Sequence, residues 1–343
     1  MRQKNIALDA MGGDHGPGVV IPAARKALEE IPDIALVLVG DEQTLKGEIQ
    51  RQGLQHENRI RIQHASEVVD MDEVPVTALK NKKDSSMRIA IDLVKTQRVQ
   101  ACVSAGNTGA LMATGKFVLK TIPGISRPAI CTALPSMTGQ IHMLDLGANL
   151  ECTPENLQQF AVMGSVLAQS VEGINSPLVG LLNIGSEAIK GSEIIKRAHQ
   201  LIADSDLNYY GFIEGDDIYK GTVNVVVTDG FAGNISLKTG EGLAALVSQI
   251  LRREFKRNLL TKIIAIIALP VLKAVQKTLD PRRYNGASLL GLNGIIIKSH
   301  GSADSSSFLN AIKIANLEIE NDIPQRISSI LKSYFANQEG QAL

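Results

Sequence analysis

The chain has 343 residues, of which 44% are apolar and 20% charged, as is typical of a globular protein with a buried core. Lysine and arginine together number 35, as do aspartate and glutamate, so the formal net charge is zero. A nucleic-acid-binding protein usually carries a basic excess, and the aromatic residues that stack on bases make up only 3% of this chain. We therefore expect no nucleic-acid partner.

The cysteines predict the compartment. Cys102, Cys131 and Cys152 form no C-x-x-C pair and no spacing typical of metal ligands. Such sparse use is typical of a reducing compartment. The first residues lead straight into an apolar run broken by Asp9, which does not resemble a signal peptide. We expect a cytoplasmic protein without a metal site.

Short apolar runs alternate with helical patterns along the chain. The runs are rich in Val, Ile and Leu and do not alternate in polarity, which is typical of parallel strands buried on both faces. They lie at residues 6–11, 36–40, 101–104, 143–147, 179–185, 223–230 and 294–298, with helical patterns at 19–30, 107–120, 156–172, 192–204 and 234–255. This order predicts a single α/β domain over residues 1–343, of one or two lobes, with a large, mostly parallel sheet flanked by helices.

Six of these runs end in a loop that combines glycine with Asn, Asp, Ser or Thr. The loops lie at residues 9–14, 104–109, 145–149, 183–191, 229–234 and 299–302. In open α/β sheets, ligands bind at the carboxyl ends of the strands. Glycine lets the backbone approach a ligand, and the first N–H groups of a helix attract anions. Six loops of one design favour a shared anion pocket over six unrelated turns.

No nucleotide-binding motif accompanies these loops. A Walker loop needs G-x-x-x-x-G-K-[ST], but five residues separate Gly109 from Gly115, and Phe117 follows Lys116. No G-x-G-x-x-G follows a strand, and no G-x-S-x-G elbow indicates a serine hydrolase. The loops therefore fit a small phosphate better than a nucleotide.

Residues 251–283 differ from the rest of the chain in being both basic and apolar. They contain nine Lys or Arg residues against Glu254 and Asp280, a net charge of +7 (9 − 2) that the remainder balances. Residues 263–272 form an apolar run of ten residues, whereas a membrane-spanning helix needs about 20. Flanking cations and Pro270 favour a protruding amphipathic helical hairpin that docks on anionic lipid. A buried helix or a dimer contact is the alternative interpretation.

Eight motifs, in the expected order along almost the whole chain, resemble those of the bacterial phosphate acyltransferases of phospholipid synthesis. They are residues 8–14 with 16–17, 83–87, 104–110, 145–149, 183–187 with 190–191, 229–234, 284–291 and 300–301. Many members of that family carry Gly and Pro where this chain has Asn285 and Ser288.

The resemblance implies a fold like that of isocitrate and isopropylmalate dehydrogenases, without their metal or nicotinamide and without any cofactor. It implies a homodimer that converts acyl-[acyl carrier protein] and inorganic phosphate to acyl phosphate. It also implies peripheral attachment to the inner face of the plasma membrane. There the acyl phosphate passes to a membrane glycerol-3-phosphate acyltransferase.

In this reaction phosphate is itself the nucleophile, so no Ser or Cys nucleophile is required. The enzyme must align phosphate with the thioester and stabilise the developing oxyanion. Candidate catalytic residues are Lys190 as a cation, Asn149 and Asn234 as oxyanion donors, and His300. Candidate substrate-binding residues are Asp9, Gly12, Gly13, Asp14, Lys82, Lys83, Ser104, Gly106, Asn107, Thr108, Glu187, Asp229 and Gly230. For Lys82 and Lys83, a solvated surface is an equally good interpretation.

Two other functions compete with this one. A dehydrogenase-like oxidoreductase would use the same fold, but the sequence has no metal carboxylate cluster and no dinucleotide motif. A non-catalytic lipid-binding scaffold would fit the basic apolar segment, but it has no need of six polar loops at strand ends.

Overall fold

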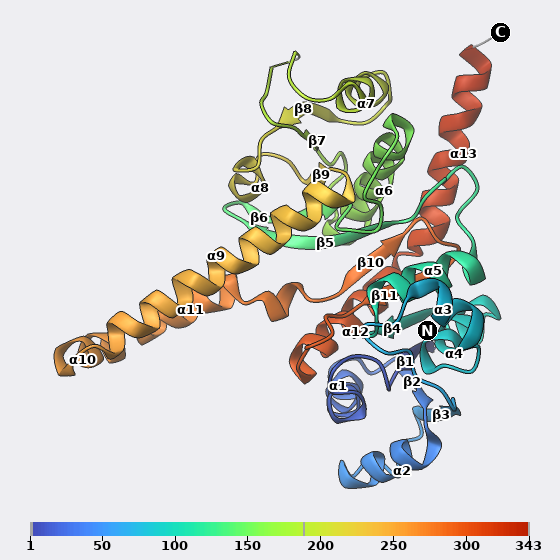
Figure 1. Cartoon of the computed structure of the whole chain (residues 1–343), viewed down its shortest axis with the longest axis vertical. Helices are drawn as coiled ribbons and strands as arrows, with labels where there is room; N and C mark the ends of the chain where they lie inside the picture. The colour runs from blue at the N-terminus through green and yellow to red at the C-terminus, as the bar shows by residue number, and fades with distance from the viewer. Residues whose placement is uncertain (1–2, 188, 342–343) are drawn as a thin grey trace.

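The computed structural model describes residues 3–187 and 189–341, and within them one sheet runs through the molecule (Figure 1). Its strands are β1 (Lys4–Asp9), β2 (Ile34–Gly40), β3 (Ile60–His64), β4 (Ala101–Ser104), β5 (Ala129–Ser136), β6 (Gly139–Leu144), β7 (Val179–Leu182), β8 (Tyr209–Ile213), β9 (Val225–Val227), β10 (Ala287–Leu290) and β11 (Ile295–Lys298). Their spatial order is β3-β2-β1-β4-β11-β10-β5-β6-β9-β7-β8. In the described chain, seven of the ten neighbouring pairs are parallel, which confirms the predicted fold class.

Helices connect these strands and cover the sheet. They are α1 (Pro17–Glu30), α2 (Glu42–Arg51), α3 (Pro75–Asn81), α4 (Ser86–Lys95), α5 (Thr108–Leu119), α6 (Pro154–Glu172), α7 (Glu193–Ala203), α8 (Asp217–Lys220), α9 (Gly230–Lys256), α10 (Leu259–Ile267), α11 (Leu269–Leu279), α12 (Ser305–Glu320) and α13 (Ile323–Gln341), with a 3₁₀ turn at Pro281–Tyr284.

The core forms on both faces of the sheet because successive strand residues point in opposite directions. In β1, Ile6 and Leu8 belong to the cluster that α1 and α12 cover, whereas Ala7 belongs to the cluster that α4 and α5 cover. A third cluster buries β7 and β9 against α6, α7 and α13. Strands buried on both faces explain the apolar runs without alternation that the sequence shows.

Three antiparallel steps reverse the strand direction near the middle of the sheet. β11 pairs antiparallel with β10, β10 with β5, and β5 with β6, and the following strands β9, β7 and β8 keep the direction of β6. The carboxyl ends of β1, β4 and β11 therefore lie at one end of the sheet, and those of β6, β9 and β7 at the other. The six loops therefore do not share one end of the sheet, contrary to the prediction, because the three antiparallel steps lie between the strands that carry them.

Helices α9, α10 and α11 form an arm that projects away from the sheet (Figure 1). Of the 27 residues of α9, only Gly230 and Gly233 at its start are buried, and α10 buries none. Asn258 and Thr261 cap α10 reciprocally, and Pro270 lies in the first turn of α11, where its missing N–H does no harm. The predicted protruding helical segment is confirmed. No described helix has the length and apolar content that crossing a membrane would require.

Two glycines of α9, one packed against the sheet and one open to solvent, allow a test of the packing at the start of this helix. A Cβ on Gly233 would lie 1.9 Å from the Asp145 carbonyl oxygen, whereas a Cβ on Gly242 would meet nothing within 4 Å. We expect Gly233→Ala to lower the free energy of unfolding by about 1–3 kcal/mol. Gly242→Ala should raise it by up to about 1 kcal/mol, because alanine favours the helix. Urea denaturation measures both, and equal stabilities would contradict the packing described here.

Candidate functional site

Asp9, at the end of β1, is the centre of one polar cluster. Its carboxylate accepts hydrogen bonds from the Gly12 N–H at 3.1 Å and from the Ser104 hydroxyl at 2.6 Å. The Ser86 side chain at the start of α4 also bonds to it. Burial raises the pKa of Asp9, and these bonds oppose that shift. The carboxylate thus joins the loops after β1 and β4 to the start of α4.

Glycine is required where these loops meet. A Cβ on Gly12 would lie 2.5 Å from the Asp9 carboxylate and 2.9 Å from the Gly106 nitrogen. Gly13 has φ +84° and would place a Cβ 2.8 Å from the Cβ of Ala105. The Asp14 N–H donates to the Gly301 carbonyl at 2.9 Å, which adds the loop after β11 to the cluster. Three of the six predicted loops therefore do come together.

Lys298 is a member of this cluster that the sequence analysis missed. It ends β11, is 8% exposed, and its Nζ donates to the carbonyls of Ala105, at 3.2 Å, and Ser299. Burial lowers the pKa of Lys298 to about 8, opposed by Asp9 and Asp14. The sequence feature that could have revealed this residue is a lysine at the end of an otherwise apolar strand, Ile295–Lys298.

His300 lies at the exposed rim of the cluster. Its backbone N–H donates to Asn285 Oδ1 at 2.8 Å, and its Nδ1 accepts from the Ser302 N–H at 3.2 Å. This bond assigns the proton of the neutral ring to Nε2. Partial burial, with help from Lys238 and Lys298, lowers the pKa of His300, so the imidazole is neutral at neutral pH.

The start of α5 follows the loop whose Ala105 carbonyl accepts from Lys298. Asn107 caps the helix by accepting the Ala110 N–H at 2.9 Å, so its side chain serves the backbone rather than a ligand. Thr108 and Gly109 follow it, exposed and at the first turn, where helical N–H groups lack intrahelical partners. Backbone N–H groups without helical partners thus follow closely on Ala105, whose carbonyl accepts from the buried Lys298, and the anion cradle at this turn stays a prediction.

Lys82 is occupied by partners within the protein. Its Nζ forms ion pairs with Glu73 at 2.7 Å and Asp70 at 3.2 Å and donates to the Val68 carbonyl at 2.6 Å. Lys83 is exposed. The structure therefore places Lys82 in an ion-pair network that supports the loop before α3.

A second polar cluster surrounds Asp145, at the other end of the sheet. Asp145 accepts N–H groups of Ile130 at 2.9 Å, Ala148 at 3.1 Å and Asn149 at 2.7 Å. The amide of Asn149 donates to the Pro128 carbonyl at 2.8 Å and to Asp145 at 2.9 Å. An amide has two N–H donors, and both are used here. This buried network leaves Asn149 no donor for an oxyanion, contrary to its predicted role.

Helix α9 begins in this second cluster, and the charge of its Lys238 acts on two groups of the first. Asp229 caps it by accepting the Ala232 N–H at 2.8 Å, and Gly230 packs against Asn149. Asn234 is exposed and lies over Gly147. Residues four apart share a helix face, so Asn234 lies on the same face as Lys238. Lys238 is near enough to Lys298 and His300 for its charge to lower their pKa values. Gly230 and Lys238 are eight residues apart, which is roughly 12 Å along the helix.

Lys190 lies in a third, separate loop after β7. Its Nζ pairs with Glu187 at 2.8 Å, and both side chains are exposed. The Asn183 amide donates to the carbonyls of Gly185 and Lys190 and holds the loop together. This pair lies at the end of the sheet opposite Lys298.

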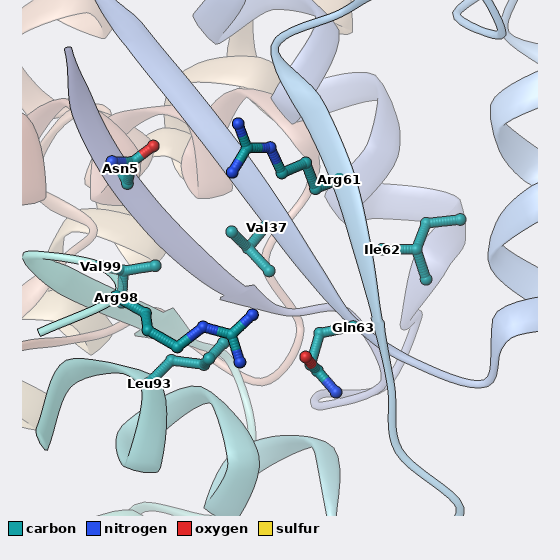
Figure 2. A pocket seen from close by; sticks show the side chains of 8 residues that line it. All are labelled: Asn5, Val37, Arg61, Ile62, Gln63, Leu93, Arg98 and Val99. Atoms are coloured by element: carbon teal, nitrogen blue, oxygen red, sulfur yellow. The ribbon is translucent and has the colours of Figure 1, made fainter. Parts of the chain in front are cut away.

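A cavity of about 110 Å³ lies elsewhere, beside the first three strands (Figure 2). Arg61 and Arg98 line it from β3 and from the turn after α4, on either side of Val37 (Figure 2). None of the predicted site residues lines this cavity.

Comparison with known proteins settles the family. A family model described as "Fatty acid synthesis protein" matches residues 4–326. A phosphate acyltransferase of Methylococcus capsulatus is 59% identical over 331 residues, which cover 96% of this chain and 98% of that protein. Another, from Nitrosococcus oceani, is 57% identical and covers 98% of this chain and 99% of its own. The chain belongs to the phosphate acyltransferase family.

Solved structures share the fold at low sequence identity. A phosphotransacetylase from Streptococcus pyogenes aligns with a TM-score of 0.62 at 17% identity, covering 95% of this chain and 94% of its own. The EutD phosphotransacetylase from Staphylococcus aureus aligns with a TM-score of 0.61 at 16% identity, covering 94% of each chain. The reversed, mostly parallel sheet is therefore an architecture that this chain shares with phosphotransacetylases.

The burial of Lys298 makes the free energy of unfolding depend on pH. Its folded pKa of about 8 lies below the ordinary value of 10.5, so between these values the unfolded chain holds a proton that the folded chain lacks. Stability from this group therefore rises with pH across that window, by at most about 1.4 kcal/mol per pH unit. We expect Lys298→Met to remove this rise. Denaturant unfolding at several pH values measures it, and parallel pH profiles for the two proteins would contradict the burial of a titrating lysine.

Proposed function

We propose that this chain transfers a fatty acyl group from an acyl carrier protein thioester to inorganic phosphate, which gives acyl phosphate for phospholipid synthesis. Family membership over nearly the full chain supports the acyl transfer. The observation that carries the phosphate site is the buried Lys298 ammonium group beside the glycine loops and the first turn of α5. Cation and backbone donors together are what a phosphate dianion requires.

Phosphate binds, in this proposal, at the N–H groups of Thr108 and Gly109, and Lys298 replaces Lys190 as the neutralising cation. Asp9 fixes the loops rather than contacting substrate. Asp14 and the Nε2–H of His300 lie at the rim, where His300 donates a hydrogen bond to the bound phosphate. Neutral His300 suits this role because it keeps one N–H without adding charge.

The reaction is direct displacement at the thioester carbonyl. A phosphate oxygen attacks the carbonyl carbon, a C–O bond forms, and the C–S bond breaks with the electron pair leaving on sulfur. All three cysteines in the described chain are buried, and burial raises the pKa of each, so none offers a competing thiolate. Asn234, on the exposed face of α9 that also carries Lys238, is the proposed donor to the developing oxyanion.

The projecting arm of α9, α10 and α11 indicates where in the cell the enzyme would work. Leu259, Ile266 and Ile267 are exposed on α10, and residues 251–283 carry the basic excess, a combination that suits an anionic lipid surface. We propose peripheral attachment to the inner face of the plasma membrane through this arm. We also propose that the exposed apolar residues of α9, such as Leu243 and Leu246, pair two copies into a homodimer. The acyl phosphate then passes to a membrane glycerol-3-phosphate acyltransferase.

The activity is tested by release of free carrier protein from acyl carrier protein. We expect release only when phosphate is added, and we expect Lys298→Met to raise the KM for phosphate by roughly tenfold or more, because a charge-assisted contact is worth about 1.5–3 kcal/mol. Lys190→Ala, at the other end of the sheet, is the matched control and should change this KM less than about twofold. Release that ignores phosphate would refute the function. A larger change of the KM for phosphate in Lys190→Ala than in Lys298→Met would assign the cationic role to Lys190 instead.

Membrane docking is tested by flotation with anionic vesicles. The double variant Ile264→Glu/Ile267→Glu should lose most of its vesicle binding, since it places two charges in the apolar run of α10. Met137→Glu changes an exposed side chain in the turn between β5 and β6 and serves as the control. Equal flotation of the wild type and the double variant would show that the arm does not dock on lipid.

A further inference from the structure

One short segment borders the proposed phosphate site without contributing any of its polar groups. Residues 70–76 follow β3 and include the first two residues of α3, and they pack against two loops of the Asp9 cluster. A Cβ on Gly301 would lie 2.6 Å from Cε of Met71, and a Cβ on Gly109 would lie 2.7 Å from Cγ of Pro75. The segment therefore borders both the loop after β11 and the start of α5.

Two polar side chains hold this segment in place. Asn107, which caps α5, also donates through Nδ2 to the carbonyls of Met71 and Glu73, each at 2.9 Å. Lys82 holds the segment from its other side through Val68, Asp70 and Glu73. Because the same Asn107 side chain caps α5 and donates to Met71 and Glu73, the position of the segment is coupled directly to the first turn of α5.

The segment presents apolar side chains to solvent in spite of these polar anchors. Met71 is 42% exposed, Val74 62% and Val76 56%. Polar residues would be expected in a solvated turn, and each apolar side chain left in water forgoes the free energy of burial. Their place next to a site for a thioester indicates a ligand with an apolar part.

We propose that residues 70–76 form the wall that contacts the acyl chain of the donor, with Met71 against the first methylenes beyond the thioester carbonyl. This inference rests on the proposed function. The carbonyl must lie close to phosphate, and Met71 is the apolar side chain that touches the loop carrying His300. The methionine side chain is flexible and adapts to an alkyl chain.

The test compares donors of different chain length. Contact with one or two methylenes corresponds to roughly four- to fifteen-fold in affinity. We expect Met71→Asp to raise the KM for a hexadecanoyl-carrier donor by that factor. The KM for an acetyl-carrier donor, which has no methylenes, and the KM for phosphate should change less than about twofold. Met71→Leu, which stays apolar, should retain the wild-type preference.

Met137→Asp is the matched control, because Met137 is 86% exposed on the turn between β5 and β6. It should leave both donors unaffected. Equal effects of Met71→Asp on the two donors, or none on either, would overturn the acyl wall while phosphate-dependent activity of the wild type still stands. Loss of that phosphate dependence in the wild type would refute the proposed function itself, so the two failures are distinguishable.

Discussion

The buried carboxylate of Asp9 is the interaction on which the candidate site depends. It accepts from the Gly12 N–H and the Ser104 hydroxyl, and its charge opposes the loss of the proton from Lys298. A carboxylate and an ammonium group in an apolar surrounding are each unfavourable alone, and each makes the other tolerable. The strands on which they lie, β1 and β11, flank β4 in the sheet, and the bonds of Asp9 to Gly12 and Ser104, with that of Lys298 to Ala105, hold the loops after these strands together.

The sequence predicted seven of the eleven described strands, because burial on both faces leaves a clear pattern, and it missed β3, β5, β8 and β10. Runs such as Ile34–Gly40 have no polar alternation, and the helices between them are capped by residues of the expected kinds, such as Asn107 and Asp229. Strand direction could not be predicted in this way. β10 and β5 are as apolar as their parallel neighbours, and only long-range pairing shows that they reverse the sheet.

That reversal explains which candidate residues came together. Asp9, Gly12, Ser104 and His300 follow strands of one direction, whereas Asn149 and Lys190 follow strands of the other. Sequence motifs mark Asn149 as strongly as Ser104, but they do not reveal that its amide is used inside the protein. Lys298 was missed for the opposite reason, since a single lysine at a strand end looks like an ordinary solvated residue until its burial is known.

The continuous helix α9 separates the far end of the arm from the candidate site. From Lys238, whose charge lowers the pKa of His300, to the end of the helix at Lys256 is 18 residues, or roughly 27 Å of helix, which is close to the thickness of the hydrocarbon layer of a bilayer. With the proposed docking of the far end of the arm on lipid, an acyl phosphate formed at the proposed site would be a single-chain amphiphile at up to that distance from the membrane. It would then reach lipid along the apolar side of the arm or on a carrier that shields its tail.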